Sequence, residues 1–159
     1  MAPLEIKKYP DKVLRKECEP VKGITEKERR IFDEMLFTMR HFCGIGLAAP
    51  QLGISKRLIV ADVEGNIIKL ANPEVIDKNG SDAMREGCLS IPDITVNIRR
   101  PDRVVVKGLD ERGKATEIKV DGLLARVLQH EIDHLKGRII IDYMTVLEKL
   151  KFKLNKRRR

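Results

Sequence analysis

Apolar residues recur at helical spacing in the segment that follows Thr25. They are Ile31, Phe32, Met35, Leu36, Met39 and Phe42, and the run stops at Gly44. Thr25 and Glu28 stand three positions apart, which is the spacing of a capping box at the start of a helix. The pattern therefore predicts a helix over about 26–43, with an apolar face turned toward the core.

A second helical pattern follows Asp121, a residue type that caps helices, and ends before Gly137. It predicts a helix over about 122–136. The apolar residues go nearly all the way round this segment, at Leu123, Leu124, Val127, Leu128, Ile132 and Leu135. A helix of this kind is expected to lie inside the core and not on the surface.

Short segments rich in β-branched residues fill most of the remaining chain. Segments 57–63 and 67–70 predict a hairpin around EGN, and Asn72 and Pro73 then break the run before 74–77. Further strand candidates are 95–98, 103–109, 116–120 and a closing strand at 138–143. The pattern predicts an α+β fold of mostly antiparallel strands packed around the buried central helix, with helices near both ends.

Composition narrows the class of protein. A chain of 159 residues suits a single domain, which we expect to span 1–159. It has no apolar run near the roughly 18 residues of a membrane span, and its start lacks the pattern of a secretory signal, so we expect a cytoplasmic protein without membrane contact. The three cysteines are an odd number, and in a reducing compartment they should be buried, reactive or bound to metal.

The C-terminal segment, about 145–159, is expected to form a basic helix and tail. Thr145 and Glu148 repeat the capping-box spacing, and Leu147, Leu150 and Leu154 share one side that we expect to face inward. Seven of the 32 basic residues lie in the last eleven positions, which hold no acid, so residues 1–148 carry only +1 of the net +8. The tail is either a solvated end or a contact for nucleic acid such as ribosomal RNA.

The buried helix carries the sequence His130-Glu131-Ile132-Asp133-His134, an H-E-x-x-H pattern. Residues four apart lie above one another on a helix, so both imidazoles can reach one metal ion while Glu131 can meet a water beside it. The alternative is a hydrogen-bonded cluster in the core. Because burial of three polar groups in an apolar helix is costly unless they are satisfied together, metal binding is the favoured interpretation.

A catalytic tetrahedral site needs three protein ligands, so a third ligand must come from elsewhere. Downstream of His134 the candidates are Asp142 and Glu148, and neither belongs to a recognisable ligand motif of a zincin protease. Upstream, Cys88 lies in the Gly-flanked, irregular-looking stretch EGCLSIP. Cys88 is either this ligand or an inert buried thiol.

Three motifs together resemble those of the peptide deformylase family. GIGLAAPQ at 44–51, EGCLS at 86–90 and HEIDH at 130–134 match the family patterns G-x-G-L-A-A-x-Q, E-G-C-L-S and H-E-x-D-H in the same order. The opening YPDKVLRKECEPV also looks like the family's N-terminal segment. The resemblance thus covers essentially the whole chain.

The resemblance implies a role for each matching residue. Cys88, His130 and His134 would be the metal ligands, and Glu131 the general acid and base. Gln51 and the backbone N–H of Leu89 would donate to the developing oxyanion. Fe(II) is the metal it implies, and Zn(II) or Ni(II) would also suit a site with one thiolate.

The implied substrates are N-formylmethionyl peptides, which lose formate. The expected substrate-binding residues are Ile45, Gly46, Met84, Gly87, Leu123 and Val127. A thioether side chain suits the apolar pocket they would form, and the less favoured alternative is that Leu123 and Val127 are plain core residues. Glu86 and Asp133 would orient ligands or pair with an arginine. His41 and Cys43 follow no motif and are expected to be incidental.

Two other classes of function stay open. One is a zincin endopeptidase, and the other is a basic ribosome- or RNA-binding module with a structural metal. Glu131 and a glutamine in a Gly-rich loop have no purpose in the second. A ribosome contact through the tail is compatible with a deformylase, whereas DNA is not an expected partner.

Overall fold

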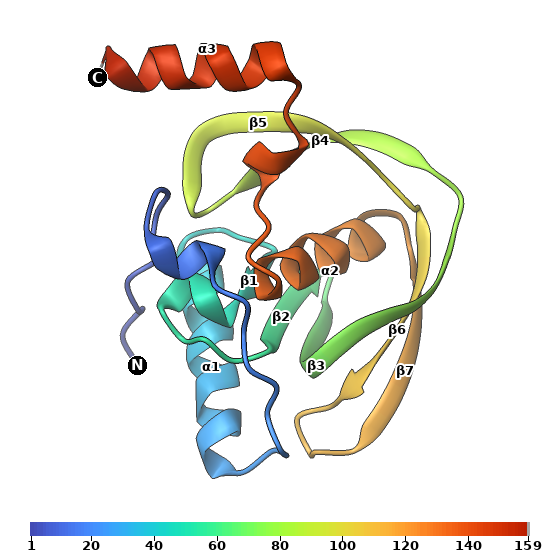
Figure 1. Ribbon diagram of the computed structural model, residues 1–159. Coiled ribbons are helices and arrows are strands. Elements are labelled where there is room, and N and C mark those ends of the chain that lie inside the picture. Colours follow the sequence, from blue (N-terminus) through green and yellow to red (C-terminus); the bar gives the residue numbers. More distant parts are fainter. Residues whose placement is uncertain (159) are drawn as a thin grey trace.

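Seven strands and three α-helices make up residues 1–158, which the computed structural model describes (Figure 1). The strands are β1 (Gly46–Ala48), β2 (Leu58–Val63), β3 (Asn66–Asn79), β4 (Asp82–Cys88), β5 (Ile91–Arg100), β6 (Arg103–Leu109) and β7 (Ala115–Asp121). The helices are α1 (Glu26–His41), α2 (Gly122–Leu135) and α3 (Val146–Arg157), with short 3-10 turns η1 (Lys12–Arg15), η2 (Ala49–Leu52) and η3 (Ile140–Tyr143). This arrangement confirms the predicted α+β class.

The strands form two antiparallel sheets. The larger has the order β1-β2-β3-β6-β7, and β4 pairs with β5 in a separate two-stranded sheet. Strand β2 is buried on both faces: Leu58 and Val60 pack toward α1, while Ile59 and Ala61 pack toward α2. The edge strand β1 therefore lies between the two helices, next to the polar residues that α2 carries.

The central helix α2 packs on the larger sheet, as the sequence pattern predicted (Figure 1). Ala125, Leu128 and Leu135 are fully buried there. Asp121 holds the N-cap position, but its side chain makes no capping hydrogen bond. Gly137 ends the helix with a φ of 74°, a backbone conformation that favours glycine.

The first helix ends two residues before the predicted boundary. Thr25 and Glu28 form the expected capping box at its start. At its end, Phe42 is the C-cap residue and Cys43 has a φ of 59°, which is outside helical geometry. The chain thus turns away from α1 just before Gly44 and enters β1.

The predicted hairpin is confirmed, but the expected break after it is wrong. Strands β2 and β3 pair from Leu58↔Ala71 to Val63↔Asn66. Asn72 and Pro73 do not end β3, which continues past a register shift between Ala71 and Glu74. The Asn72 side chain bonds to the backbone N–H and C=O of Val21, so the irregularity is a bulge fixed by a neighbouring loop.

The predicted closing strand at 138–143 is also wrong, because residues 140–143 form the turn η3. Ile139, Ile140 and Ile141 are all buried in a cluster with β5 and the N-terminal segment. Alternation in a strand would turn every second isoleucine outward, whereas a tight turn buries all three. Sequence analysis also missed β1 and β4.

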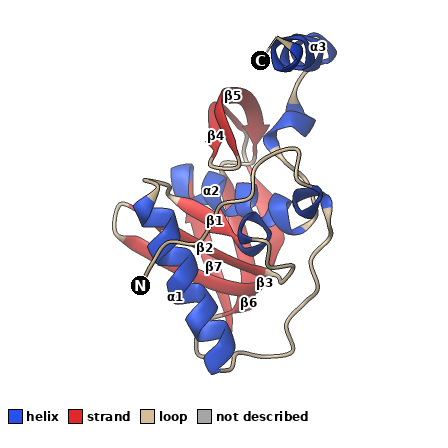
Figure 2. Cartoon of the chain, turned by 90° about the vertical axis from the view of Figure 1, so that its left-hand side faces the viewer, coloured by secondary structure: helices blue, strands red, loops and turns tan. Residues whose placement is uncertain are grey.

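Helix α3 begins at the predicted capping box but does not bury its leucines. It projects from the body in both views (Figures 1 and 2). Leu147, Leu150 and Leu154 are 60%, 53% and 47% exposed, so the expectation that they face inward is wrong. The helix instead rests on the body through Phe152, whose ring lies 5.8 Å from that of Tyr9.

At least one basic residue of the tail contacts the body of the protein. The Lys156 ammonium lies 4.0 Å from the centre of the Tyr9 ring, where it makes a cation–π contact. Arg159, which belongs to the same predicted tail, lies outside the described residues. Among residues 1–158, no helix is long and apolar enough to cross a membrane.

The capping box of α1 gives a pH-dependent prediction for stability. Hydrogen bonds from the Thr25 side chain and backbone, and then from Lys56, lower the pKa of Glu28 to about 2 from an ordinary value of 4.5. A lowered pKa stabilises the fold above the unfolded value, and this contribution is lost as the pH falls toward the folded value. Thr25→Ala should cost about 1 kcal/mol at neutral pH.

Urea unfolding of a Glu28→Gln variant tests the direction of this pH dependence. The difference in the free energy of unfolding between Glu28→Gln and wild type should be largest above about pH 5 and disappear near pH 2. Glu26→Gln is the matched control, because Glu26 is in the same helical turn but is exposed and should show little pH dependence. A Glu28→Gln difference that does not change with pH would contradict the assignment.

Candidate metal centre

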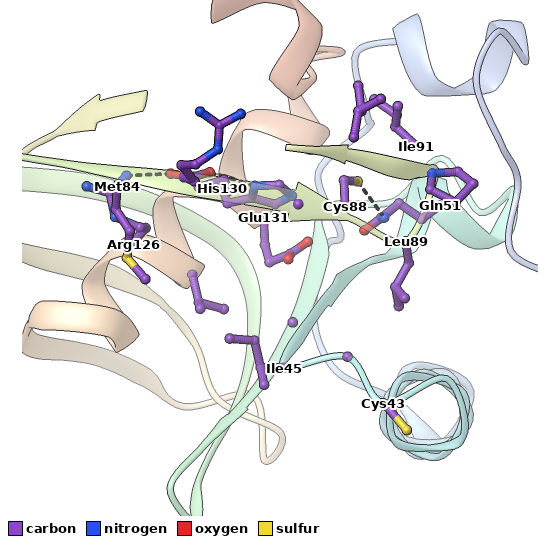
Figure 3. Close-up of a pocket in the computed structure, with 18 of the residues that line it drawn as sticks. Cys43, Ile45, Gln51, Met84, Cys88, Leu89, Ile91, Arg126, His130 and Glu131 are labelled. Carbon is purple, nitrogen blue, oxygen red and sulfur yellow. Dashed lines mark hydrogen bonds and ion pairs between the residues drawn. The ribbon is translucent and has the colours of Figure 1, made fainter. Parts of the chain in front are cut away.

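A cleft of about 500 Å³ opens between the edge strand β1, the turn from β4 to β5, and helix α2 (Figure 3). The six residues expected to bind substrate all line it: Ile45, Gly46, Met84, Gly87, Leu123 and Val127. Glu131, Gln51 and Leu89 line it as well. Three segments that are far apart in sequence therefore share one opening.

The two histidines of α2 meet Cys88 at the base of this cleft. The Nε2 atoms of His130 and His134 lie 3.3 Å apart, and Cys88 Sγ lies 3.4 Å from His134 Nε2. The three ligand atoms all lie within 4.8 Å of one another. Among the described residues, this is the one group of three such side chains close enough to hold a metal ion.

Cys88 reaches the histidines because it is the last residue of β4. The stretch that looked irregular in the sequence is a strand, which pairs with β5 and shifts register between Glu86 and Cys88. A turn at Leu89 and Ser90 follows. Glu86 and Cys88 are two positions apart, so strand alternation places both side chains on the same face of β4, toward the histidines of α2.

Glu86 fixes the orientation of the His130 ring. Its Oε1 lies 2.9 Å from His130 Nδ1, so the opposite ring nitrogen Nε2 faces Cys88 and His134. Arg100 and Arg126 also bond to Glu86, the latter at 2.6 Å. Although burial raises the pKa of Glu86, hydrogen bonds from His130 and Arg100 outweigh it and lower the pKa to about 2.

The donor set fits a divalent transition metal. One thiol and two imidazoles are ligands that Zn(II) and Fe(II) accept, and three protein ligands leave a coordination position open. Burial lowers the pKa of His134 well below its usual value, which keeps its imidazole neutral as metal binding requires. Burial also acts to lower the pKa of His130, but Glu131, Cys88 and Glu86 raise it well above the usual value.

Glu131 is buried beside the three ligands. Its Oε2 has no hydrogen-bond partner among the described residues, and burial raises its pKa to about 7. A buried carboxyl without a partner is costly, which indicates that a bound group belongs next to it. Gly46 makes room for it, since a Cβ there would lie 2.5 Å from Glu131 Oε1.

Gln51 is held with its amide nitrogen toward Cys88 (Figure 3). Its Oε1 accepts from the backbone N–H of Ala48, while Nε2 donates to Ser90 Oγ at 3.1 Å and lies 3.5 Å from Cys88 Sγ. The amides of Lys7 and Tyr9 bond to the carbonyls of Gln51 and Ser90. The N-terminal segment thus supports Gln51 and the residue that follows Leu89 in the turn.

Several contributors to the site were missed or misjudged from the sequence. Cys43, expected to be incidental, lines the cleft. Arg100 and Arg126 were not singled out, although a buried arginine in an apolar helix was a signal that Arg126 pairs with an acid. Asp142, once a candidate zincin ligand, instead pairs with Arg15 at 2.6 Å, outside the ligand group.

Comparisons with known proteins agree on one family. A model of the polypeptide deformylase family matches residues 3–150. The chain is 49% identical over 158 residues to a peptide deformylase of Thermodesulfovibrio yellowstonii, covering 96% of each chain. It is 50% identical over 144 residues to one of Halothermothrix orenii, covering 89% of this chain and 94% of that one.

Solved structures of the same family share the fold. The peptide deformylase of Thermotoga maritima superposes with a TM-score of 0.87 at 42% identity, covering 89% of this chain and 97% of that one. The peptide deformylase of Synechococcus elongatus in complex with actinonin gives a TM-score of 0.89 at 40% identity, covering 95% of this chain and 84% of that one.

Replacement of Cys88 tests the ligand group. Cys88→Ser should weaken Zn(II) binding by more than the roughly 10- to 100-fold that outer-shell partners contribute, because a serine hydroxyl stays protonated at neutral pH. Metal analysis after dialysis measures this. Cys43→Ser is the matched control, since Cys43 lines the same cleft outside the ligand group. Unchanged metal content in Cys88→Ser would exclude the thiol as a ligand.

Proposed function

This chain belongs to the peptide deformylase family, whose members remove the N-formyl group from newly synthesised polypeptides in a metal-dependent reaction, and we propose that Cys88, His130, His134 and Glu131 form its catalytic centre. The observation that supports the proposal best is the convergence of three ligand atoms within 4.8 Å beside a buried carboxyl. The cleft opens directly onto this group.

Cys88, His130 and His134 would hold a divalent ion, and Fe(II) is the metal that we propose, with Zn(II) and Ni(II) as alternatives. When bound, the metal supplies Lewis-acid chemistry, which acidifies water and polarises the formyl oxygen. The thiolate makes the ligand set softer and less positive than three imidazoles would be.

Glu131 would act as general base and then as general acid. It accepts a proton from the water that attacks the formyl carbon, and it returns a proton to the amine nitrogen as the C–N bond breaks, which releases formate and the free N-terminus. A carboxyl with a pKa raised to about 7 by burial is suited to both steps near neutral pH. Its position on α2 between the two histidines keeps it beside the reacting group.

Gln51 Nε2 and the backbone N–H of Leu89 would donate to the formyl oxygen as it gains negative charge. Ala48 and Ser90 hold the Gln51 side chain in place, and the N–H that it directs toward Cys88 Sγ would be the one that donates to the formyl oxygen. Leu89 follows Cys88 in the turn after β4 and lines the same cleft, which supports a role for its amide.

The methionine side chain of the substrate would occupy the apolar part of the cleft, against Ile45, Met84, Leu123 and Val127. Ile45, Met84 and Leu123 are exposed, although their side chains are large and apolar, which fits a surface that a substrate covers. The peptide backbone would run as an added strand between the edge of β1 and Gly87 of β4.

We further propose that the protein works in the cytoplasm and contacts the ribosome through its C-terminal helix. Its substrates are nascent chains, and its thiol ligand is preserved under reducing conditions. Helix α3 projects from the body and carries Lys149, Lys151 and Lys153 together with basic residues at its end. Ribosomal RNA is the polyanion that this surface would meet.

Glu131→Gln tests the proposed proton carrier. The variant should bind metal like wild type and release formate from N-formyl-Met-Ala-Ser roughly 100- to 10,000-fold more slowly, since only the proton acceptor is lost. Glu117→Gln, at an exposed position of β7, is the control. A rate within tenfold of wild type would overturn the role of Glu131, and cleavage of internal peptide bonds would favour an endopeptidase.

Removal of residues 155–159 tests the ribosome contact. Each lost phosphate contact should lower the salt slope of binding by about one, so the truncated protein should bind ribosomes more weakly and with a flatter salt dependence. Arg157→Gln with Arg158→Gln is a second variant that keeps the chain length and the Lys156 contact with Tyr9. Formate release should hardly change in either. Cosedimentation equal to wild type at low salt would leave the tail as a solvated end.

A further inference from the structure

A chain of hydrogen bonds connects the C-terminal segment to His130. The Tyr143 hydroxyl donates to Asp133 Oδ2 at 2.6 Å. The same oxygen accepts from Arg100 Nη1 at 2.9 Å, and Arg100 bonds to both oxygens of Glu86 at 2.7 and 3.0 Å. Glu86 in turn meets His130 Nδ1. Tyr143 is therefore the outermost member of the network that orients a metal ligand.

The inner part of this network is shielded from water. The side chains of Arg100 and Glu86 are only 5% and 6% exposed. The guanidinium of Arg100 is planar. Its Nε and Nη2 donate to Glu86, while Nη1 donates to Asp133. A tilt of the guanidinium at its Asp133 end would therefore displace Glu86 as well, because both contacts belong to one rigid plane.

Tyr143 restrains the Asp133 end of Arg100 in two ways. Its hydroxyl bonds to Asp133 and lies 3.3 Å from Arg100 Nη1. Its ring packs below the guanidinium of Arg100 at 4.9 Å, with Arg138 at 5.4 Å. The ring is part of the apolar cluster of the η3 isoleucines, so the position of the hydroxyl is fixed by packing.

We propose that Tyr143 is a positioning residue for the metal site, which acts on His130 through Asp133, Arg100 and Glu86. The inference rests on the proposed ligand set and adds that the segment leading into α3 completes the support of that set. Loss of the hydroxyl leaves Asp133 Oδ2 with Arg100 as its remaining described donor and frees the guanidinium to pivot. His130 then keeps its place in α2 but loses part of its fixed ring orientation.

Tyr143→Phe tests the proposal, because it removes the hydroxyl and keeps the ring. Zn(II) affinity, measured by competition with a chelator, should fall by about three- to tenfold, less than the roughly 10- to 100-fold typical of a direct outer-shell partner such as Glu86. The visible spectrum of the Co(II)-loaded protein should shift with it. Tyr9→Phe is the matched control, since the Tyr9 hydroxyl has no hydrogen-bond partner among the described residues and its ring belongs to the same cluster.

A double-mutant cycle separates positioning from a general loss of stability. In a Glu86→Gln background the effect of Tyr143→Phe on Zn(II) affinity should largely disappear, because its route to His130 is already broken. Full additivity, or a Tyr143→Phe affinity and spectrum equal to wild type, would overturn the proposal. If Tyr143→Phe does not fold, Asp133→Asn is the replacement variant, and it should give the same loss of Zn(II) affinity. Weak Zn(II) binding by wild type would instead refute the ligand set itself.

Discussion

The buried carboxylate of Glu86 is the interaction on which the site depends. It bonds to His130 from α2, to Arg100 from β5 and to Arg126 from α2, and it is itself part of β4. These bonds join the small sheet to the central helix at the place where the chain must bring Cys88 to the histidines. Removal of one partner would leave a buried charge uncompensated, which is far more costly than loss of an exposed ion pair.

The same arrangement explains how the Glu131 carboxyl can exchange a proton beside a metal site. Burial raises the pKa of both glutamates beside His130, but at Glu86 hydrogen bonds from His130 and Arg100 outweigh it, whereas at Glu131 burial outweighs the nearby charges, so the two pKa shifts are opposite. The first stays ionised and orients a ligand, and the second is able to exchange a proton near neutral pH. Gly46 keeps β1 close enough to exclude bulk water from this carboxyl.

The sequence predicted the elements with strong periodicity and the residues in dense motifs. Helices α1 and α2 and the hairpin of β2 and β3 follow from local patterns, and residues from each of the three motifs line one cleft. Features set by distant contacts were not predictable. The isoleucines before Tyr143 resemble a strand in the sequence because their burial against β5 is not a local property. The leucines of α3 were expected to face inward, but they are about half exposed. Arg100 gave no signal because its partners are 14 and 33 positions away.

The central claim is that one thiolate and two imidazoles bind a single metal ion in the cleft. X-ray absorption spectroscopy of the Zn(II)-loaded wild-type protein tests it most directly, since sulfur and nitrogen ligands differ in both scattering and distance. The account predicts one sulfur at about 2.3 Å and two imidazole nitrogens at about 2.0–2.1 Å, with a light atom completing the shell. A shell of nitrogen and oxygen alone, or one with two sulfurs, would contradict it.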